Sequence, residues 1–220
     1  MLLFKYTCYV ATLSLKQFTI WILFGFTSIT TVLLQFFASD GIISSTYELF
    51  PYLGTLAFVA IWSQYTAALI NKTGLFKVQY STWIGRIALL LILMHPTLFL
   101  VQRFLDTNLL PPESYITYVG PLRAWAIGLA VAALTSFLLY EVLKPFRRKL
   151  INFGVWPFVG LLQALAMLAI FVHSLTVGTS LNTAYFAVWW WFLGIILIPG
   201  LILQVMSDFN IPPSRKKDAS

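Results

Sequence analysis

The stretch WIGRIALLLILMHPTLFLVQRF, residues 83–104, decides the fold class of this chain. It carries no charged residue between Arg86 and Arg103. A hydrocarbon core of about 30 Å needs roughly 20 mainly apolar residues per helix, so this stretch predicts one membrane-spanning helix. The same stretch contains His95, followed at once by Pro96, at a depth where a polar ring would find no water.

Five further segments of the 220-residue chain have the same character. With the first, the predicted membrane helices cover about residues 18–38, 50–70, 83–104, 119–142, 154–177 and 184–206. Hydrophobic residues make up 60% of the sequence and charged residues only 10%, which excludes an ordinary soluble domain. Alternating barrel strands are absent from the pattern. We therefore predict an all-α, polytopic membrane protein, a six-transmembrane-helix bundle forming one integral membrane domain over residues 1–220.

Lysine and arginine are distributed unequally between the two ends of this predicted bundle. Of the fourteen, only Arg103 and Arg123 lie in the odd-numbered connections. The other twelve lie in the even-numbered connections and the tails: Lys5, Lys16, Lys72, Lys77, Arg86, Lys144, Arg147, Arg148, Lys149, Arg215, Lys216 and Lys217. The positive-inside rule predicts cytoplasmic N- and C-termini, with the 105–118 and 178–183 loops outside. We expect a multi-pass protein of the cytoplasmic membrane, in the lipid bilayer, with no nucleic-acid partner, because topology explains the net charge of +7.

The sequence lacks the residues and motifs that several kinds of chemistry require. No charged residue lies near the centre of a segment, unlike in most proton-coupled transporters, and Glu141 at an inner helix end is within reach of Lys144. There is no GxGxxG motif after a strand and no P-loop. Cys8 is the single cysteine, which excludes an intramolecular disulfide and a CxxC redox pair. The first segment is too long for a signal-peptide core and is expected to remain in the protein.

The two histidines of the chain, His95 and His173, lie on the third and fifth segments, which run in the same direction. At 1.5 Å per residue, His95 lies about 12 Å below Arg103 and His173 about 7 Å below Gly178, so both are in the outer half. Helix tilt or a kink at Pro96 could remove the offset. Two imidazoles at one depth could ligate a heme iron from both sides. The alternative is that each histidine only hydrogen-bonds a neighbouring helix.

The order and spacing of several further motifs carry a resemblance. They are Gly85 ten residues before His95, then Tyr115, Ile116 and Gly120, LAVAALTS at 129–136, the basic loop KPFRRK at 144–149, and Trp156 before His173. In these features, over about residues 80–180, the chain resembles the ferric reductase-like transmembrane domain family. Within the family it is most similar to the heme-binding membrane subunits of periplasmic methionine sulfoxide reductase systems. The resemblance implies a ferric reductase-like core over about residues 50–206, with heme iron as the bound metal.

The chain departs from the wider family at the inner side of the membrane. Two-heme members carry an inner and an outer histidine on each of the two ligand helices. Here Gly160 stands at the inner position of the fifth segment, and Ser81 or Thr82 stands at that of the third. Because both inner ligands are missing together, we predict a single heme near the outer face, held by His95 and His173.

Other residues near the predicted site have two interpretations each. Arg103 and Arg123 are the only outer cations, so they are candidate partners for the heme propionates, although interfacial snorkelling explains them equally well. An aromatic belt is the favoured account of the tryptophans at 189–191, and a shield or electron path beside the heme is the alternative. Gln163 and Gln64 could contact a quinone, but hydrogen bonding between helices is favoured.

The predicted function is that of a membrane b-type cytochrome passing electrons across or within the membrane through one bis-histidine heme b, as a subunit of an oxidoreductase. The resemblance implies a separate electron donor, a quinone or a cytoplasmic flavin reductase, and an extracytoplasmic acceptor. The alternative is a non-redox membrane scaffold or small permease whose histidines serve only helix packing.

Overall fold

The computed structural model of the chain describes residues 2–39, 45–73, 78 and 81–209, and the side chains of residues 18–39, 45–71, 78 and 81–209. This described part is helical and contains no strand, which confirms the all-α prediction. The elements in chain order are α1 (Leu2–Ala38), α2 (Thr46–Thr73), α3 (Thr82–Thr107), α4 (Glu113–Val119), η1 (Pro121–Arg123), α5 (Ala124–Leu143), η2 (Lys144–Phe146), α6 (Arg147–Asn152), α7 (Trp156–Val177), η3 (Thr179–Asn182) and α8 (Ala184–Phe209).

Six helical stretches are long and apolar enough to cross a membrane, as predicted. They are Phe18–Ala38, Thr46–Asn71, Thr82–Thr107, Pro121–Asn152, Trp156–Val177 and Ala184–Phe209. Each overlaps its predicted segment, because length and hydropathy together define a spanning helix. The fourth span is composite, since η1, α5, η2 and α6 follow one another without a break.

Two helical regions extend beyond the predicted segments. Helix α1 begins at Leu2, well before its apolar window, because residues 2–17 contain neither proline nor glycine to end the helix. The short helix α4 lies within the predicted 105–118 loop, with Glu113 in its first turn. Hydropathy did not indicate α4, because seven residues are too few to form a spanning segment.

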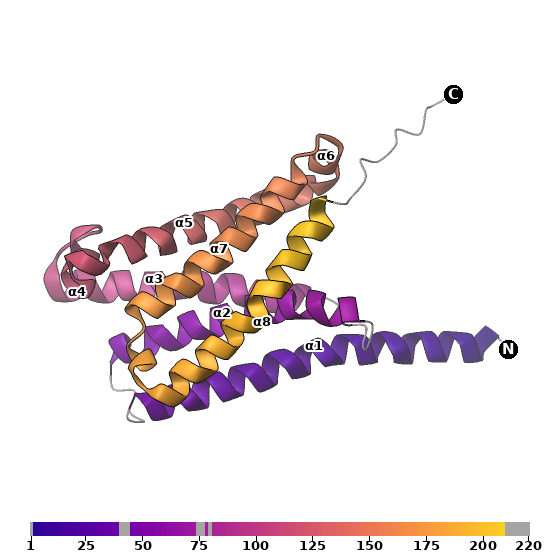
Figure 1. Ribbon diagram of the computed structural model, residues 1–220, viewed down its shortest axis with the longest axis horizontal. Helices are drawn as coiled ribbons and strands as arrows, with labels where there is room; N and C mark the ends of the chain where they lie inside the picture. The colour runs from indigo at the N-terminus through magenta and orange to yellow at the C-terminus, as the bar shows by residue number, and fades with distance from the viewer. Residues whose placement is uncertain (1, 40–44, 74–77, 79–80, 210–220) are drawn as a thin grey trace.

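Helix α8 connects two pairs of packed helices, α2/α3 and α5/α7 (Figure 1). Helix α2 packs against α1, α3 and α8, whereas α5 packs against α7. Helix α8 contacts both α2 and α7 and so joins the pair α2/α3 to the pair α5/α7. Within the described residues, α3 makes little direct contact with either α5 or α7. The space between α3 and α7 is therefore available for a site.

Helix α1 illustrates how the bundle separates its lipid face from its protein face. Its exposed apolar residues recur every three or four positions: Phe18, Ile22, Phe26, Ile29, Leu33 and Phe37. Its opposite face buries Thr27, Thr31 and Gln35, which are also four residues apart. The threonine hydroxyls donate to carbonyls one turn earlier, Leu23 O and Thr27 O, both at 2.7 Å. A polar stripe thus faces the bundle rather than lipid.

The described cations fall into two groups at opposite ends of the bundle. Figure 1 shows the start of α1 and the end of α8 at the end that carries α6, with α4 at the other end. Arg103 and Arg123 flank α4, and the basic residues of the 144–149 loop lie in η2 and α6. The side chains of Lys5, Cys8, Lys16, Lys72, Lys77, Arg215, Lys216 and Lys217 lie outside the described residues.

Candidate functional site

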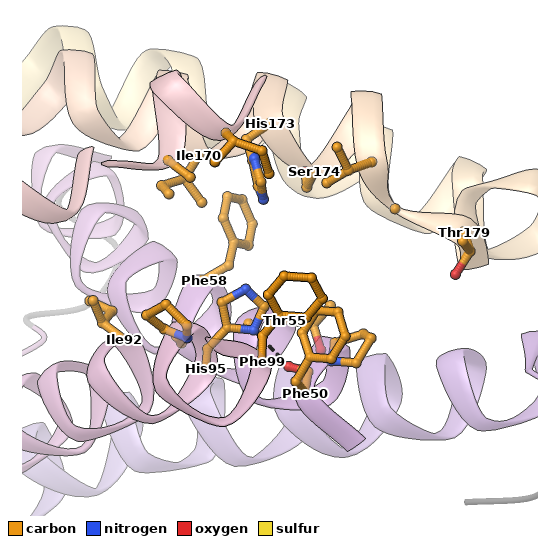
Figure 2. A pocket seen from close by; sticks show the side chains of 18 of the residues that line it. Phe50, Thr55, Phe58, Ile92, His95, Phe99, Ile170, His173, Ser174 and Thr179 are labelled. Carbon is orange, nitrogen blue, oxygen red and sulfur yellow. Dashed lines mark hydrogen bonds between the residues drawn. The ribbon is translucent and has the colours of Figure 1, made fainter. Parts of the chain in front are cut away.

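A cavity of about 260 Å³ lies between the pairs α2/α3 and α5/α7, and both histidines line it. Its wall is mostly apolar, with residues contributed by α1, α2, α3, α4, α5, α7, η3 and α8. Figure 2 shows the imidazole rings of His95 and His173 on opposite sides of the cavity, with the ring of Phe58 between them in this view. The fold therefore brings together the two residues that the sequence singled out.

His95 is oriented by helix α2. Its Nδ1 lies 2.7 Å from the carbonyl oxygen of Phe50, and its ring lies 5.3 Å from the Phe50 ring, centroid to centroid. Because a carbonyl oxygen only accepts hydrogen bonds, Nδ1 must carry the proton in this arrangement. In the neutral ring, Nε2 then keeps a free lone pair and can serve as a ligand atom.

His173 is oriented in the same way by helix α5. Its Nδ1 lies 2.8 Å from the carbonyl oxygen of Ala126, which is fully buried. The same argument places the proton on Nδ1 and the lone pair on Nε2. Histidines that bind metals usually donate their second ring nitrogen to a carbonyl or carboxylate in this manner. Both rings therefore have the hydrogen-bond pattern of a metal ligand, although hydrogen bonding between helices alone would produce it too.

Aromatic side chains form one wall of the cavity. Phe58 and Trp190 lie 4.6 Å apart, centroid to centroid, and both are almost fully buried. Phe186 stacks on Trp190 at 5.8 Å with an interplanar angle of 21°. The indole nitrogen of Trp190 donates to the hydroxyl of Ser174, the residue next to His173, at 2.8 Å. This aromatic wall is buried and is bonded to the residue next to His173.

The three consecutive tryptophans have three different environments. Trp190 is buried and lines the cavity, whereas Trp191 is exposed on the outside of the bundle. Trp189 is partly buried and donates from its indole nitrogen to Thr31 of α1 at 2.9 Å. The exposure of Trp191 agrees with an aromatic belt. Trp190 instead lines the cavity between the two histidines, where a shield or electron path beside a heme would have to lie.

Helix α4 covers the edge of the cavity with aromatic residues that no sequence pattern assigned to the site, although Tyr115 contributes to the family resemblance. Tyr115 stacks on Phe99 of α3 at 5.2 Å and 6°, and Tyr118 stacks on Tyr47 of α2 at 5.7 Å and 14°. Burial raises the pKa of Tyr115 and Tyr118 above the ordinary value of 10.0, so both phenols stay neutral. The i, i+3 spacing of the two tyrosines was the available signal.

The outer arginines do not line the cavity. Arg103 donates from Nε to the carbonyl of Ser114 at 3.2 Å and from a terminal nitrogen to Thr117 Oγ1 at 2.8 Å. Its guanidinium also lies over the ring of Tyr118, 5.6 Å from the centroid. Arg123 is exposed on η1. Their assignment as propionate partners stays a prediction.

Polar groups at the cavity come instead from residues that the sequence analysis missed. Gln35 of α1 is buried, lines the cavity and lies 2.7 Å from the hydroxyl of Thr55 on α2. Thr179 and Ser180 of η3 also line it. No sequence pattern marked these residues, because each is a common polar residue in or beside an apolar segment.

At the inner end of the bundle, Gly160 and Ser81 are both engaged in other contacts. A Cβ atom at Gly160 would collide with the carboxylate of Asp208, a buried residue of α8 that also accepts from Gln204 at 3.2 Å. Ser81 serves as the N-cap of α3, and its hydroxyl accepts from the amide of Ile84. Asp208 therefore fills the space in front of Gly160, and the hydroxyl of Ser81 is already used in capping α3.

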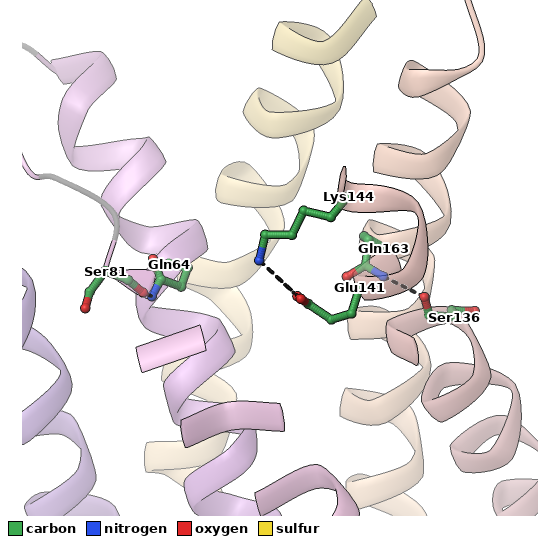
Figure 3. A network of polar contacts seen from close by, with 6 residues as sticks. All are labelled: Gln64, Ser81, Ser136, Glu141, Lys144 and Gln163. Carbon is green, nitrogen blue, oxygen red and sulfur yellow. Dashed lines mark hydrogen bonds and ion pairs between the residues drawn. The ribbon is translucent and has the colours of Figure 1, made fainter. Parts of the chain in front are cut away.

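The intramembrane glutamines make the favoured contacts between helices (Figure 3). Gln64 donates to the carbonyl of Ser81 at 3.1 Å, and Gln163 donates to the carbonyl of Ser136 at 2.8 Å. Lys144 pairs with Glu141 at 3.2 Å, which confirms the predicted contact.

Among the described residues, no three or more His, Cys, Asp or Glu side chains gather where they could hold a bare metal ion. The two histidines alone offer two ligand atoms, which suits a metal whose other ligands come with it. No family model, no curated protein and no solved structure matches the chain. The resemblance to the ferric reductase-like family stays a prediction.

Proposed function

We propose that the protein is a membrane b-type cytochrome that holds one heme between His95 and His173 and passes single electrons as a subunit of an oxidoreductase. The orientation of the two histidines carries this proposal. In each ring Nδ1 is engaged by a carbonyl of a neighbouring helix, and the rings lie on opposite sides of one cavity. This leaves two Nε2 atoms as ligands for one metal centre.

The composition of the cavity suits a heme. Its walls are mainly apolar, and flat aromatic rings such as Phe58 and Trp190 can lie against a macrocycle. Its volume of about 260 Å³ lies below the range of about 300–1,000 Å³ for small-molecule sites, so heme binding would require the lining helices to move apart. Gln35, Thr179 and Ser180 supply the few polar groups that such sites use to fix orientation.

The residues of the chain would each have a defined task. Heme iron, when bound, supplies one-electron redox chemistry. His95 and His173 would both hold the heme iron, and ligation by two histidines would favour electron transfer over oxygen activation. The carbonyls of Phe50 and Ala126 hold the rings in one tautomer and increase the basicity of Nε2. The buried aromatic wall excludes water and so tunes the potential.

The proposal includes membership of the ferric reductase-like family, a cytoplasmic location of both termini and a heme near the outer face. The charge distribution supports the orientation through the positive-inside rule. A quinone or a cytoplasmic flavin reductase would be the electron donor, and an extracytoplasmic protein or ferric iron the acceptor.

Helix packing is the competing role for the histidines, as in a scaffold or small permease. The bonds to Phe50 and Ala126 agree with both roles, because each joins two helices. A packing histidine, however, does not need a partner across a cavity. The position of the rings on opposite sides of one cavity therefore favours heme ligation.

Absorption spectroscopy of the purified full-length protein tests the proposal. Protein produced with ample heme precursor should show an intense Soret band and the sharp reduced-state bands of a low-spin b-type cytochrome. His95→Ala and His173→Ala should each lose most of the heme or convert it to high spin, since one axial ligand is removed. A colourless wild-type protein, or full low-spin heme in either variant, would overturn the assignment.

Thr97→Ala is a matched control for these variants. Thr97 lies two residues from His95 on α3, is exposed, and donates only within its own helix, to Leu93 O at 2.7 Å. The control should retain the wild-type spectrum. Loss of heme in Thr97→Ala would show that any disturbance of α3 removes the cofactor, which would deprive the histidine results of their meaning.

A further inference from the structure

Gly54 of α2 lies directly against the ring of His95. A Cβ atom at Gly54 would come within 2.9 Å of Cε1, 3.0 Å of Nδ1 and 3.4 Å of Nε2 of that ring. Carbon atoms that are not bonded to each other prefer separations of about 3.5–4.0 Å. A residue with a side chain therefore does not fit at this position while the ring stays in place.

The same face of α2 supplies the acceptor for His95. Phe50, whose carbonyl accepts from Nδ1 at 2.7 Å, lies one helical turn before Gly54. In an α-helix the carbonyl of residue i points toward the amide of residue i+4, so the acceptor and the missing side chain are neighbours. Together Phe50 and Gly54 form a notch in α2 that receives the imidazole.

The ring has no simple way to avoid a side chain at position 54. Helices α2 and α3 form the most extensive helix–helix contact of the described chain, so separating them would disturb packing along both helices. Rotation of the ring about its side-chain torsions would break the bond to Phe50. It would also change the direction of Nε2 relative to His173 across the cavity.

We propose that Gly54 is a positioning residue that sets the orientation of His95 as a heme ligand. This inference rests on the proposed heme site. The missing side chain at position 54 keeps the imidazole seated on the Phe50 carbonyl with Nε2 directed into the cavity. Gly54 also lines the cavity, and the role proposed for it is exerted through His95.

The test compares Gly54→Ala with Gly85→Ala in the full-length, heme-loaded protein. The two substitutions are chemically identical and both lie in membrane helices, but a Cβ at Gly85 meets no heavy atom within 4 Å. Gly54→Ala should lower heme affinity about 10- to 100-fold, the usual effect of disturbing the support of a metal ligand. The heme that remains should be high-spin, or low-spin with altered electron paramagnetic resonance values. Gly85→Ala should behave as the wild type.

A second measurement, thermal unfolding of the protein without added heme, covers the case in which Gly54→Ala folds poorly. Alanine in a helix interior is ordinarily more favourable than glycine, so only the collision with the ring should destabilise this variant. Gly54→Ala in a His95→Ala background should then recover, because the ring that the methyl group meets is gone. Equal destabilisation in both backgrounds would overturn the steric basis of the inference.

The possible results separate the two proposals. A wild-type protein that binds no heme overturns the proposed function and with it the role of Gly54 in ligand positioning. A wild-type protein with low-spin heme, together with a Gly54→Ala variant of identical heme content and spectrum, overturns the inference about Gly54 alone.

Discussion

At the scale of single residues, the two histidines are held with different degrees of tightness. His95 is bonded to Phe50, and its ring occupies the space that a Cβ atom at Gly54 would need, so α2 confines the ring on two sides. His173 is bonded to Ala126 of α5, and the adjacent Ser174 accepts from Trp190. The orientation of His95 therefore depends on helix–helix distance, whereas that of His173 also depends on a side-chain network.

Arg103 has two separable contributions, an anchor for α4 and a positive charge near the outer edge of the cavity. Arg103→Ala should increase hydrogen–deuterium exchange in α4 about 10- to 100-fold, because loss of charge-assisted bonds costs about 1.5–3 kcal/mol and each 1.4 kcal/mol is a factor of ten. It should also lower the heme midpoint potential, because a nearby cation disfavours the oxidised, more positive iron. Exchange mass spectrometry and a redox titration measure the two effects.

Arg103→Lys separates the two contributions. Lysine keeps the charge but cannot reproduce the two-pronged contact with Ser114 and Thr117, so exchange should rise while the potential stays near the wild-type value. Arg123→Ala is the control for α4, because Arg123 is exposed on the adjacent η1. If Arg103→Ala left both exchange and potential unchanged, neither role would stand.

The sequence predicted some residues of the candidate site and could not predict others. His95 and His173 were found because they are the only histidines, each within an apolar segment. Gly54 was not found, because its importance depends on the register between α2 and α3, which no single-helix pattern encodes. Trp190 could not be separated from its two neighbours, because their environments differ only through the rotation of α8.

At the scale of elements, hydropathy predicted the membrane-spanning segments but neither the short helix α4 nor the buried polar stripe of α1. The six spanning stretches overlap the predicted segments because about 20 apolar residues are needed in each. Helix α4 is amphipathic and short, so its tyrosines pack on α2 and α3 without producing a hydropathy signal. The buried stripe of Thr27, Thr31 and Gln35 on α1 is likewise invisible to an averaged scale, since neighbouring apolar residues mask it.

At the scale of the whole molecule, the orientation in the membrane is testable by labelling with a membrane-impermeant thiol reagent. In a Cys8→Ser background, Leu110→Cys and Phe153→Cys would place single thiols at opposite ends, at positions that are 61% and 79% exposed. In intact cells Leu110→Cys should react, and Phe153→Cys only after permeabilisation, because the cations favour a cytoplasmic location for the 143–153 loop. The reverse pattern would place the histidines in the cytoplasmic half.

The number of hemes per chain tests how the inner and outer halves of the bundle differ. A second heme would need a second ligand pair at the inner side, and this chain has no third histidine. The carboxylate of Asp208 occupies the space in front of Gly160, and Ser81 caps α3. Methionine could substitute in principle, but Met167 is fully buried within the core cluster and does not line the cavity.

We therefore expect one heme per chain by the pyridine hemochrome assay combined with quantitative amino-acid analysis. His95→Ala/His173→Ala should contain none, since no second site would keep a heme after the outer pair is lost. The double variant tests for a second heme site more sharply than the heme-to-protein ratio of the wild type does. A weakly loaded second site could leave that ratio near one. Heme retained in the double variant, or a wild-type ratio near two, would mean that the inner half binds heme through ligands other than histidine. The carboxylate of Asp208 would then have to move away from Gly160 when heme binds.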